Sequence, residues 1–368
     1  MKKIVLVLLA AALLTGCADN AASDTTSSIA ETTPVTTPAD SEDNIDSLIT
    51  GKYNNTTVTD EEAALGVTAE KKAAFIAANG YEIYDVAMQS LPAFLHYSQQ
   101  NSKKLAETDF TSISSKYTVE SAAIPSSKGD HTIPLDLISD GTKQKDTVLI
   151  IHGLGENRHQ STEQMAMFLQ MGYNVLVYDQ RGAGEYTAPN TTYGVLEHYD
   201  TIDCVKHLRT IIGDNKIILF GKSMGGATAA MALGDADTAK EISYTILDFP
   251  VGSFRGMVGK NMKGYCPDEY IEGALDWDDL FLQEFIGIRF SMGEVADYVK
   301  DTKVPVLVFS SKADDLVPPE QEQGIYDAIK SDKKYIYVDE TATHCGLFYT
   351  QRELYQSLVT KFLGGELV

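Results

Sequence analysis

Three residues in the second half of the chain could together perform nucleophilic catalysis. Ser223 stands in the sequence Gly-Lys-Ser-Met-Gly, between a short apolar run and a run of helix-forming residues. Asp314 and His344 each follow a predicted strand, so the chain order is nucleophile, acid, base. A histidine can take the proton of a serine hydroxyl, and a carboxylate can hold the imidazole in the required tautomer. The three residues therefore predict a serine nucleophile that attacks a carbonyl group.

The sequence around Ser223 predicts a sharp turn between a strand and a helix. Residues 216–220 are rich in branched apolar side chains, and residues 227–233 are good helix formers. Gly221 and Gly225 stand two residues before and after the serine, where so tight a turn leaves no room for side chains. A phosphate-binding loop also contains Gly-Lys-Ser, but it requires a glycine at position 216, which is lysine. We therefore reject nucleotide binding and expect no cofactor.

Backbone N–H groups near Ser223 could stabilise the oxyanion that forms on an attacked carbonyl. The sequence His-Gly-Leu-Gly at 152–155 follows a predicted strand, and its glycines let the loop approach a ligand closely. We expect the N–H groups of Leu154 and Met224 to form this oxyanion hole. A simple strand-to-helix turn is the alternative, and we interpret His152 as a structural residue.

Other residues with catalytic or metal-binding chemistry are weaker candidates. Asp315 is the second choice for the acid, and Asp248, at the end of another predicted strand, is the third. Cys345 has no nucleophile motif of its own, and Cys204 lies in an amphipathic helical stretch that favours a place in the core. The seven histidines form neither an HExxH motif nor a tight cluster with cysteine, so we expect no metal site.

Strand and helix patterns alternate from residue 147 onward. Continuous apolar strands of this kind indicate a mainly parallel sheet with helices on both faces, in which sites lie at the carboxyl ends of strands. Two alternating runs, 116–124 and 131–138, predict a hairpin at the sheet edge. Asp179 and Arg181, after one strand, are expected to hold a turn. The predicted strands are 147–151, 174–178, 216–220, 244–247, 304–309 and 334–338, and the predicted helices are 163–171, 195–212, 227–233, 320–330 and 352–363.

The N-terminal residues predict export and a lipid anchor. Lys2 and Lys3 precede an apolar run, residues 4–14, that is too short to span a bilayer but suits a signal peptide over residues 1–16. The following Leu-Thr-Gly-Cys is similar to the lipobox of bacterial lipoproteins, in which cleavage leaves a diacylglycerol on the cysteine, here Cys17. An ordinary signal peptide is the alternative. Lipidation would leave three of the four cysteines, which cannot all pair, so no disulfide framework is expected.

Two further segments precede the main domain, which we place at residues 111–368. Residues 17–43 are mostly Ala, Ser, Thr, Asp and Pro, a composition that favours a flexible tether at the extracytoplasmic face of the cell membrane. Residues 44–110 predict a helical extension, with Thr59 or Asp60 as a cap and a second helix at 83–99. We expect this extension to pack on the main domain.

The strongly negative charge of the chain excludes several partners. The formal charge is −22, and it becomes −24 when Lys2 and Lys3 are removed with the signal peptide, leaving 28 basic against 52 acidic residues. Nucleic acid and anionic lipid surfaces would be repelled by the folded domain. Cationic ligands would be attracted, but we favour the interpretation that the charge serves solubility.

Six motifs together resemble those of the α/β-hydrolases. The nearest branch is the serine-aminopeptidase-like and acyltransferase-like proteins that are often described as cell-surface hydrolases. The resemblance implies an α/β-hydrolase fold and assigns the acid to Asp314, because Val317 and Pro318 stand three and four residues after it. Lys222 departs from the more usual Glu, His or Tyr inside the elbow, which bears on substrate preference. The motifs are IIHGLGENR, VLVYDQRGAGE, TTYGVLEHYD, LFGKSMGGATA, SSKADDLVPPE and THCGLF.

Residues 250–302 predict a helical cap insertion over the site. This segment lies between two predicted strands and is too long for a simple connection. It is rich in aromatic residues, which could line the site or form the core of the cap itself. Acidic residues crowd positions 268–284, where they would either attract cationic substrates or form a solvated face.

Two functions from different classes remain open. The first, which we favour, is an exported, membrane-tethered serine hydrolase that cleaves ester, thioester or amide bonds through an acyl-enzyme on Ser223, as an esterase rather than a peptidase. The second is a non-catalytic ligand-binding lipoprotein on a hydrolase fold. The expected partners are a small acyl substrate and, through Cys17, the membrane. The sequence predicts no oligomeric state.

Overall fold

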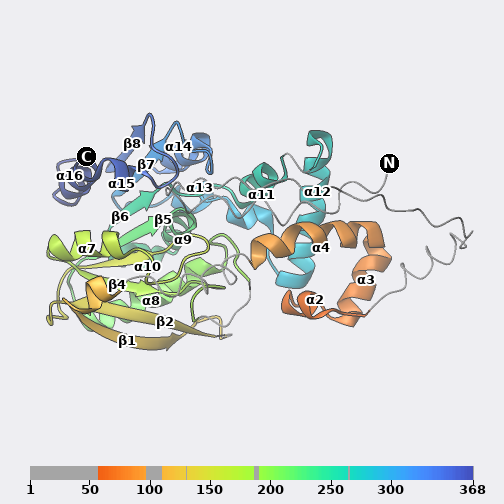
Figure 1. Cartoon of the computed structure of the whole chain (residues 1–368), viewed down its shortest axis with the longest axis horizontal. Coiled ribbons are helices and arrows are strands. Elements are labelled where there is room, and N and C mark those ends of the chain that lie inside the picture. Colours follow the sequence, from red (N-terminus) through yellow and green to blue (C-terminus); the bar gives the residue numbers. More distant parts are fainter. Residues whose placement is uncertain (1–56, 97–109, 130, 186–189, 264–265, 368) are drawn as a thin grey trace, which may run out of the picture.

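A mixed eight-stranded sheet lies at the centre of the structure, a computed structural model that describes residues 57–96, 110–129, 131–185, 190–263 and 266–367 (Figure 1). The strands are β1 (Thr118–Pro125), β2 (Thr132–Ser139), β3 (Thr147–Ile151), β4 (Asn174–Tyr178), β5 (Ile217–Lys222), β6 (Ile242–Asp248), β7 (Val306–Ser311) and β8 (Lys334–Asp339). They lie in the order β1-β2-β4-β3-β5-β6-β7-β8. The pairs β1–β2 and β2–β4 are antiparallel, and the other pairs are parallel. The predicted signal peptide and tether, with Cys17, lie outside the described residues.

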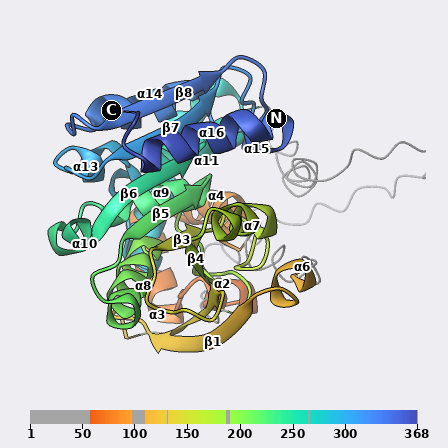
Figure 2. The same ribbon diagram turned by 90° about the vertical axis from the view of Figure 1, so that its left-hand side faces the viewer.

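Alternate residues of the central strands face two separate apolar cores. In β3, Val148 and Ile150 face one core and Leu149 faces the other. The first core is covered by α7 (Thr162–Gln170) and α16 (Arg352–Leu363), which Figure 2 shows on the same side of the sheet. The second is covered by α8 (Glu197–Ile212), α9 (Met224–Ala232) and α14 (Pro319–Ala328). The predicted mainly parallel sheet with helices on both faces is thereby confirmed.

The predicted elements of the sheet region agree with the structure in type, and the differences lie at their ends. The hairpin is confirmed, since β1 pairs antiparallel with β2 and lies at the edge of the sheet. The helix after the serine begins at Met224, three residues earlier than predicted. Three short helices were not predicted, because one or two turns show no helical period: α6 (Thr111–Ser114), α10 (Ala236–Glu241) and α15 (Leu347–Thr350).

Two helical segments far apart in the sequence pack against each other. The insertion between β6 and β7 contains α11 (Phe254–Met262), α12 (Asp268–Phe281), the π-helical turn η2 (Leu282–Ile286), the 3₁₀ turn η3 (Phe290–Gly293) and α13 (Ala296–Val299). The N-terminal segment forms α2 (Asp60–Ala64), α3 (Ala69–Asn79) and α4 (Tyr81–Leu95), and Figure 1 shows α4 alongside α12. None of the helices in the described ranges combines the length and hydrophobicity that a membrane crossing requires.

An aromatic cluster holds the N-terminal helices on the insertion. The rings of Phe75 and Tyr84 meet those of Phe281 and Phe285, with centroid distances of 4.4 to 6.3 Å within the cluster. Aromatic pairs at such distances contribute beyond the burial of their area. The N-terminal helices therefore pack on the insertion, which lies within the segment 111–368 that the sequence analysis assigned to the main domain.

The predicted start of the N-terminal helices is confirmed, but one helix was missed. Thr59 caps α2 through a capping box, in which its hydroxyl accepts from the Glu62 N–H at 3.2 Å and the Glu62 carboxylate accepts from the Thr59 N–H at 2.8 Å. The predicted helix at 83–99 corresponds to α4, which begins two residues earlier, and the end of that prediction lies outside the described residues. Helix α3 was not predicted, and Gly80, with φ of 93°, separates it from α4.

Asp278 makes the packing of α4 on α12 sensitive to pH. Its carboxyl is buried, and one oxygen accepts from the Ser90 hydroxyl at 2.7 Å. Burial raises its pKa from the ordinary value of 3.8 to about 8. Between these values the folded protein keeps a proton that the unfolded chain releases, so the free energy of unfolding falls as the pH rises from about 4 to about 8.

We therefore expect Asp278→Asn, which keeps an acceptor for Ser90, to raise the melting temperature relative to the wild type at pH 8 and much less at pH 5. A relief of about 1 kcal/mol corresponds to roughly 1–2 °C, because the entropy of unfolding grows with chain length. Calorimetry at the two pH values measures the difference. Asp276→Asn, at an exposed position of the same helix, is the control and should show no such growth with pH. An Asp278→Asn effect that is equal at both pH values would contradict the expectation.

Candidate active site

Ser223 lies in a sharp turn between β5 and α9. Its backbone has φ of 55° and ψ of −119°, a region that residues with side chains rarely adopt. A Cβ on Gly221 would lie 2.2 Å from the carbonyl oxygen of Gly225, and a Cβ on Gly225 would lie 2.2 Å from that of Ile151. Only glycine fits at these two positions, as the sequence predicted, and the turn presents Ser223 at the N-terminus of α9.

A continuous hydrogen-bond chain joins Ser223, His344 and Asp314. The Ser223 hydroxyl lies 2.8 Å from Nε2 of His344, and Nδ1 of His344 lies 2.7 Å from Oδ2 of Asp314. Because Nδ1 faces a carboxylate, Nδ1 carries the proton and Nε2 is free to accept from the serine. Oδ1 of Asp314 accepts from the N–H groups of Leu316 and Val317 at 2.8 and 2.9 Å. The Asp314 side chain is fully buried and that of His344 is 11% exposed, so the chain is sheltered from water.

Of the two N–H groups predicted for an oxyanion hole, one directly follows the serine and the other belongs to a loop whose Gly153 packs against the serine. Leu154 belongs to the loop after β3, and Met224 is the first residue of α9, directly after Ser223. Within the part of the chain that the structure describes, neither backbone N–H has a hydrogen-bond acceptor. The positive end of the α9 dipole also lies at this position. Both groups are thus available to an anionic oxygen of a ligand.

Two further residues beside the histidine have strained backbones. Phe249, directly after β6, has φ of 53°, and its buried ring meets the His344 ring edge-on at 6.0 Å. Cys345, directly after His344, also has φ of 53°. Such conformations cost about 1–3 kcal/mol each and persist where the surroundings impose them, as they do at functional sites. The sequence analysis missed Phe249, and no residue pattern signals a positive φ at a phenylalanine.

The alternative catalytic residues do not join the chain. His344 directs Nδ1 to Asp314, and the Asp315 side chain is exposed. Asp248 is buried, which raises its pKa to about 7, and its backbone carbonyl accepts from the Ser223 N–H at 2.8 Å. Burial also raises the pKa of the Cys345 thiol well above its usual value, so this sulfur is not an activated nucleophile. Among the described residues, no group of three or more His, Cys, Asp or Glu side chains could hold a metal ion.

Charged and polar residues hold the loops around the site. Asp179 accepts from the N–H groups of Arg158 and Glu185 at 2.8 and 2.9 Å, so its predicted role in a turn is confirmed. Arg181 instead reaches the hairpin, where it donates to Nδ1 of His131 at 3.3 Å. The predicted structural role of His152 is likewise supported, since both of its ring nitrogens are hydrogen-bonded to backbone groups.

The insertion contacts the loop that carries Asp314. Lys260 of α11 donates to the backbone carbonyls of Asp315 and Leu316. Gln321 of α14 accepts from the N–H groups of Gly252 and Ser253, at the start of the insertion, at 3.0 and 3.1 Å. Movement of α11 would therefore displace the backbone directly after Asp314.

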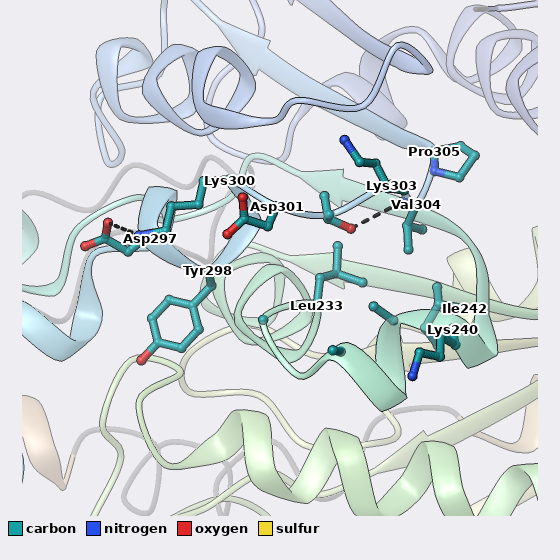
Figure 3. A pocket seen from close by; sticks show the side chains of 14 residues that line it. Leu233, Lys240, Ile242, Asp297, Tyr298, Lys300, Asp301, Lys303, Val304 and Pro305 are labelled. Carbon is teal, nitrogen blue, oxygen red and sulfur yellow. Dashed lines mark hydrogen bonds and ion pairs between the residues drawn. The ribbon is translucent and has the colours of Figure 1, made fainter.

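A separate cavity lies at the amino ends of the parallel strands β6 and β7. It has a volume of about 610 Å³, and Leu233, Ile242, Tyr298 and Val304 are among the residues that line it (Figure 3). Ile242 is the first residue of β6, and Val304 precedes β7. Ser223, Asp314 and His344 instead follow the carboxyl ends of parallel strands. The cavity is therefore distinct from the serine site.

The fold and the N-terminal sequence define a class of protein. Residues 146–243 match the family described as the alpha/beta hydrolase fold, and the sheet order with its parallel core agrees with that match. Residues 1–18, which include Cys17, match the prokaryotic membrane lipoprotein lipid attachment site. The chain has an α/β-hydrolase fold and is an exported lipoprotein that a lipid anchors to the membrane.

Its relatives include proteins of unassigned activity and solved esterases. The chain is 29% identical to the uncharacterized protein YqkD of Bacillus subtilis over 240 residues, which are 64% of this chain and 74% of YqkD. It is 22% identical to the uncharacterized protein YfhR of Escherichia coli O157:H7 over 222 residues, which are 59% of this chain and 69% of YfhR. The esterase Pf2001 of Pyrococcus furiosus superposes with a TM-score of 0.56 at 24% identity, covering 71% of this chain and 96% of that one. The similarity to the esterase Pf2001 shows only that the two proteins share a fold.

Proposed function

We propose that this lipoprotein is a serine hydrolase that cleaves carboxylic esters through an acyl-enzyme on Ser223, with thioesters and amides as further candidate substrates. The observation that carries the proposal is the chain from the Ser223 hydroxyl to Nε2 of His344 at 2.8 Å and from Nδ1 to Asp314 at 2.7 Å. A hydrogen-bonded nucleophile, base and orienting acid is the arrangement that activates a serine. Esters are favoured because an alkoxide is a better leaving group than an amide nitrogen.

The mechanism follows from this geometry. His344 takes the proton of Ser223 through Nε2 as the hydroxyl oxygen attacks the carbonyl carbon, while Asp314 stabilises the imidazolium. The N–H groups of Leu154 and Met224 stabilise the oxyanion of the tetrahedral intermediate. His344 then gives its proton to the leaving alcohol, and the acyl group remains on the serine. A water molecule, activated by the same histidine, releases the acid.

The finer assignments form part of the same proposal. The six sequence motifs favour the serine-aminopeptidase-like branch of cell-surface hydrolases. We further propose that Cys17 carries the lipid, that residues 17–43 are the tether, and that residues 44–110 and the insertion at 250–302 flank a hydrolase domain within 111–368. Contact of α11 with the acid loop supports a role for the insertion as a cap.

Labelling with a fluorophosphonate probe tests the proposal. We expect the purified chain from residue 44 onward to be labelled on Ser223, with the modified residue identified by peptide mapping. His344→Ala should abolish the label, because the serine then lacks its base. A folded wild-type protein that is neither labelled nor able to hydrolyse p-nitrophenyl butyrate would favour a non-catalytic, ligand-binding lipoprotein.

A further inference from the structure

An ion pair between a buried lysine and a partly buried glutamate lies between the serine turn and the loop that carries Leu154. Lys222, the residue before Ser223, contacts Oε1 of Glu156 through Nζ at 2.5 Å. Oε2 of the same carboxylate accepts from the Gly153 N–H at 2.8 Å. The Lys222 side chain is 10% exposed and that of Glu156 is 23% exposed. Glu156 therefore joins the loop to the turn through both of its carboxylate oxygens.

The same loop residues fix the peptide unit whose N–H group belongs to Leu154. The Gly153 carbonyl accepts from Nδ1 of His152 at 2.8 Å and from the Glu156 N–H at 3.3 Å. Because a peptide unit is planar and trans, the direction of this carbonyl fixes the direction of the Leu154 N–H. Glu156 thus holds Gly153 on both sides, through its side chain at the N–H and through its backbone at the carbonyl.

The loop is packed directly against the nucleophile. A Cβ on Gly153 would lie 3.6 Å from Cβ of Ser223 and 3.3 Å from Oε2 of Glu156. No side chain or solvent layer separates the loop from the serine at this point. A shift of Glu156 would therefore move the Leu154 N–H relative to the atom that attacks the substrate.

Both members of the pair stay ionised at neutral pH. Burial by itself would lower the pKa of Lys222, but the charge of Glu156 outweighs burial and raises that pKa. Burial by itself would raise the pKa of Glu156, but the charge and hydrogen bond of Lys222 and the Gly153 N–H hold it below its ordinary value. The contact is thus one between full charges in a sheltered site, where it is stronger than at the surface.

We propose that Lys222 and Glu156 are positioning residues for the oxyanion hole. They hold the Leu154 N–H in a fixed position relative to Ser223 and do not touch the substrate. This inference rests on the hydrolase function proposed above. It also changes the interpretation of Lys222. The sequence analysis connected this departure from the usual elbow residues with substrate preference, whereas the structure directs its ammonium group to Glu156.

Variants of Glu156 separate positioning from stability. Glu156→Gln keeps an acceptor for the Gly153 N–H but removes the charge, and Glu156→Leu removes both. Because loss of one oxyanion donor costs about 10²–10³ in kcat, we expect kcat to fall about tenfold in Glu156→Gln and about a hundredfold in Glu156→Leu, with KM changed less than about threefold. The affinity for an aryl trifluoromethyl ketone, whose adduct places an oxyanion in the same hole, should fall in parallel with kcat/KM.

Three further variants of the pair test whether misfolding is the cause of the loss. Lys222→Met leaves the partly buried carboxylate of Glu156 without its cation and is expected to lower the melting temperature as well as kcat. Lys222→Arg keeps the ion pair and should retain most of kcat. The double variant Lys222→Met/Glu156→Leu leaves no uncompensated charge, so it should fold and still show the loss of kcat and of ketone affinity.

A matched control comes from a second lysine–glutamate pair, which is more deeply buried. Lys72 and Glu62 lie 2.7 Å apart with side chains 5% and 8% exposed, and they join α3 to α2. Glu62→Gln should lower the melting temperature while leaving kcat per folded molecule within about twofold. If the Glu156 variants behave like Glu62→Gln, the pair is merely structural and the inference is wrong. A wild-type protein that neither turns over esters nor binds the ketone overturns the hydrolase proposal together with this one.

Discussion

Replacement of Ser223 with alanine is expected to lower kcat for p-nitrophenyl butyrate by about a millionfold, because loss of the nucleophile removes the acyl-enzyme route. The substitution removes only the hydroxyl that lies 2.8 Å from Nε2 of His344. The backbone at this position already has φ of 55°, which alanine tolerates no better and no worse than serine. Stability should therefore change little, and circular dichroism with thermal melting checks this.

The control for this variant is Ser127→Ala, an exposed serine of the turn between β1 and β2. Its rate should equal that of the wild type. His344→Ala should lower kcat by a similar factor to Ser223→Ala, and the double variant should be no slower than either single one, since the two residues act as a unit. A Ser223→Ala protein that retains more than about one per cent of kcat would show that another nucleophile performs the reaction.

The site residues could be predicted because each stands at the end of an apolar strand. Ser223, Asp314 and His344 follow β5, β7 and β8, which are parallel, so their side chains emerge at one edge of the sheet. Continuous buried apolar runs locate β5 and β7, whereas β8 is a half-buried strand in which Tyr335 and Tyr337 alternate with Ile336 and Val338. The pattern of buried strands therefore carries the geometry of the site as well as the fold.

The contacts between loops and between distant helices could not be predicted. The pairing of Lys222 with Glu156 depends on the path of a loop after another strand, which no periodicity describes. The docking of α4 on α12 joins segments almost two hundred residues apart. The apolar pattern of each helix predicts a buried face but does not say which element covers it. The sequence analysis grouped Asp278 with its acidic neighbours as a solvated or ligand-attracting set, but its helical position places it inside. Asp268, Glu269, Glu272 and Asp276 are exposed, in agreement with a solvated face.

The second large effect is expected from Asp314→Asn, which should lower kcat by about ten-thousandfold while leaving KM nearly unchanged. The reason lies in the two backbone N–H groups, of Leu316 and Val317, that donate to Oδ1 of Asp314. They will hold the amide oxygen of asparagine at the same place, so the NH₂ group must face Nδ1 of His344. That nitrogen must then accept rather than donate, which puts the ring proton on Nε2. A protonated Nε2 cannot take the proton of Ser223.

Asp315→Asn is the matched control, because it makes the same chemical change one residue away, at an exposed side chain. Its kcat should stay within about twofold of the wild type, since the contact of Asp315 with Lys260 is made by the backbone carbonyl. Steady-state kinetics on the two variants decides which carboxylate orients the histidine. A loss of kcat in Asp315→Asn, or in Asp248→Asn, with Asp314→Asn close to the wild type would place the acid elsewhere. Asp314→Ala should retain more activity than Asp314→Asn. The alanine variant leaves His344 free to adopt either tautomer, whereas the fixed amide of asparagine imposes the wrong one.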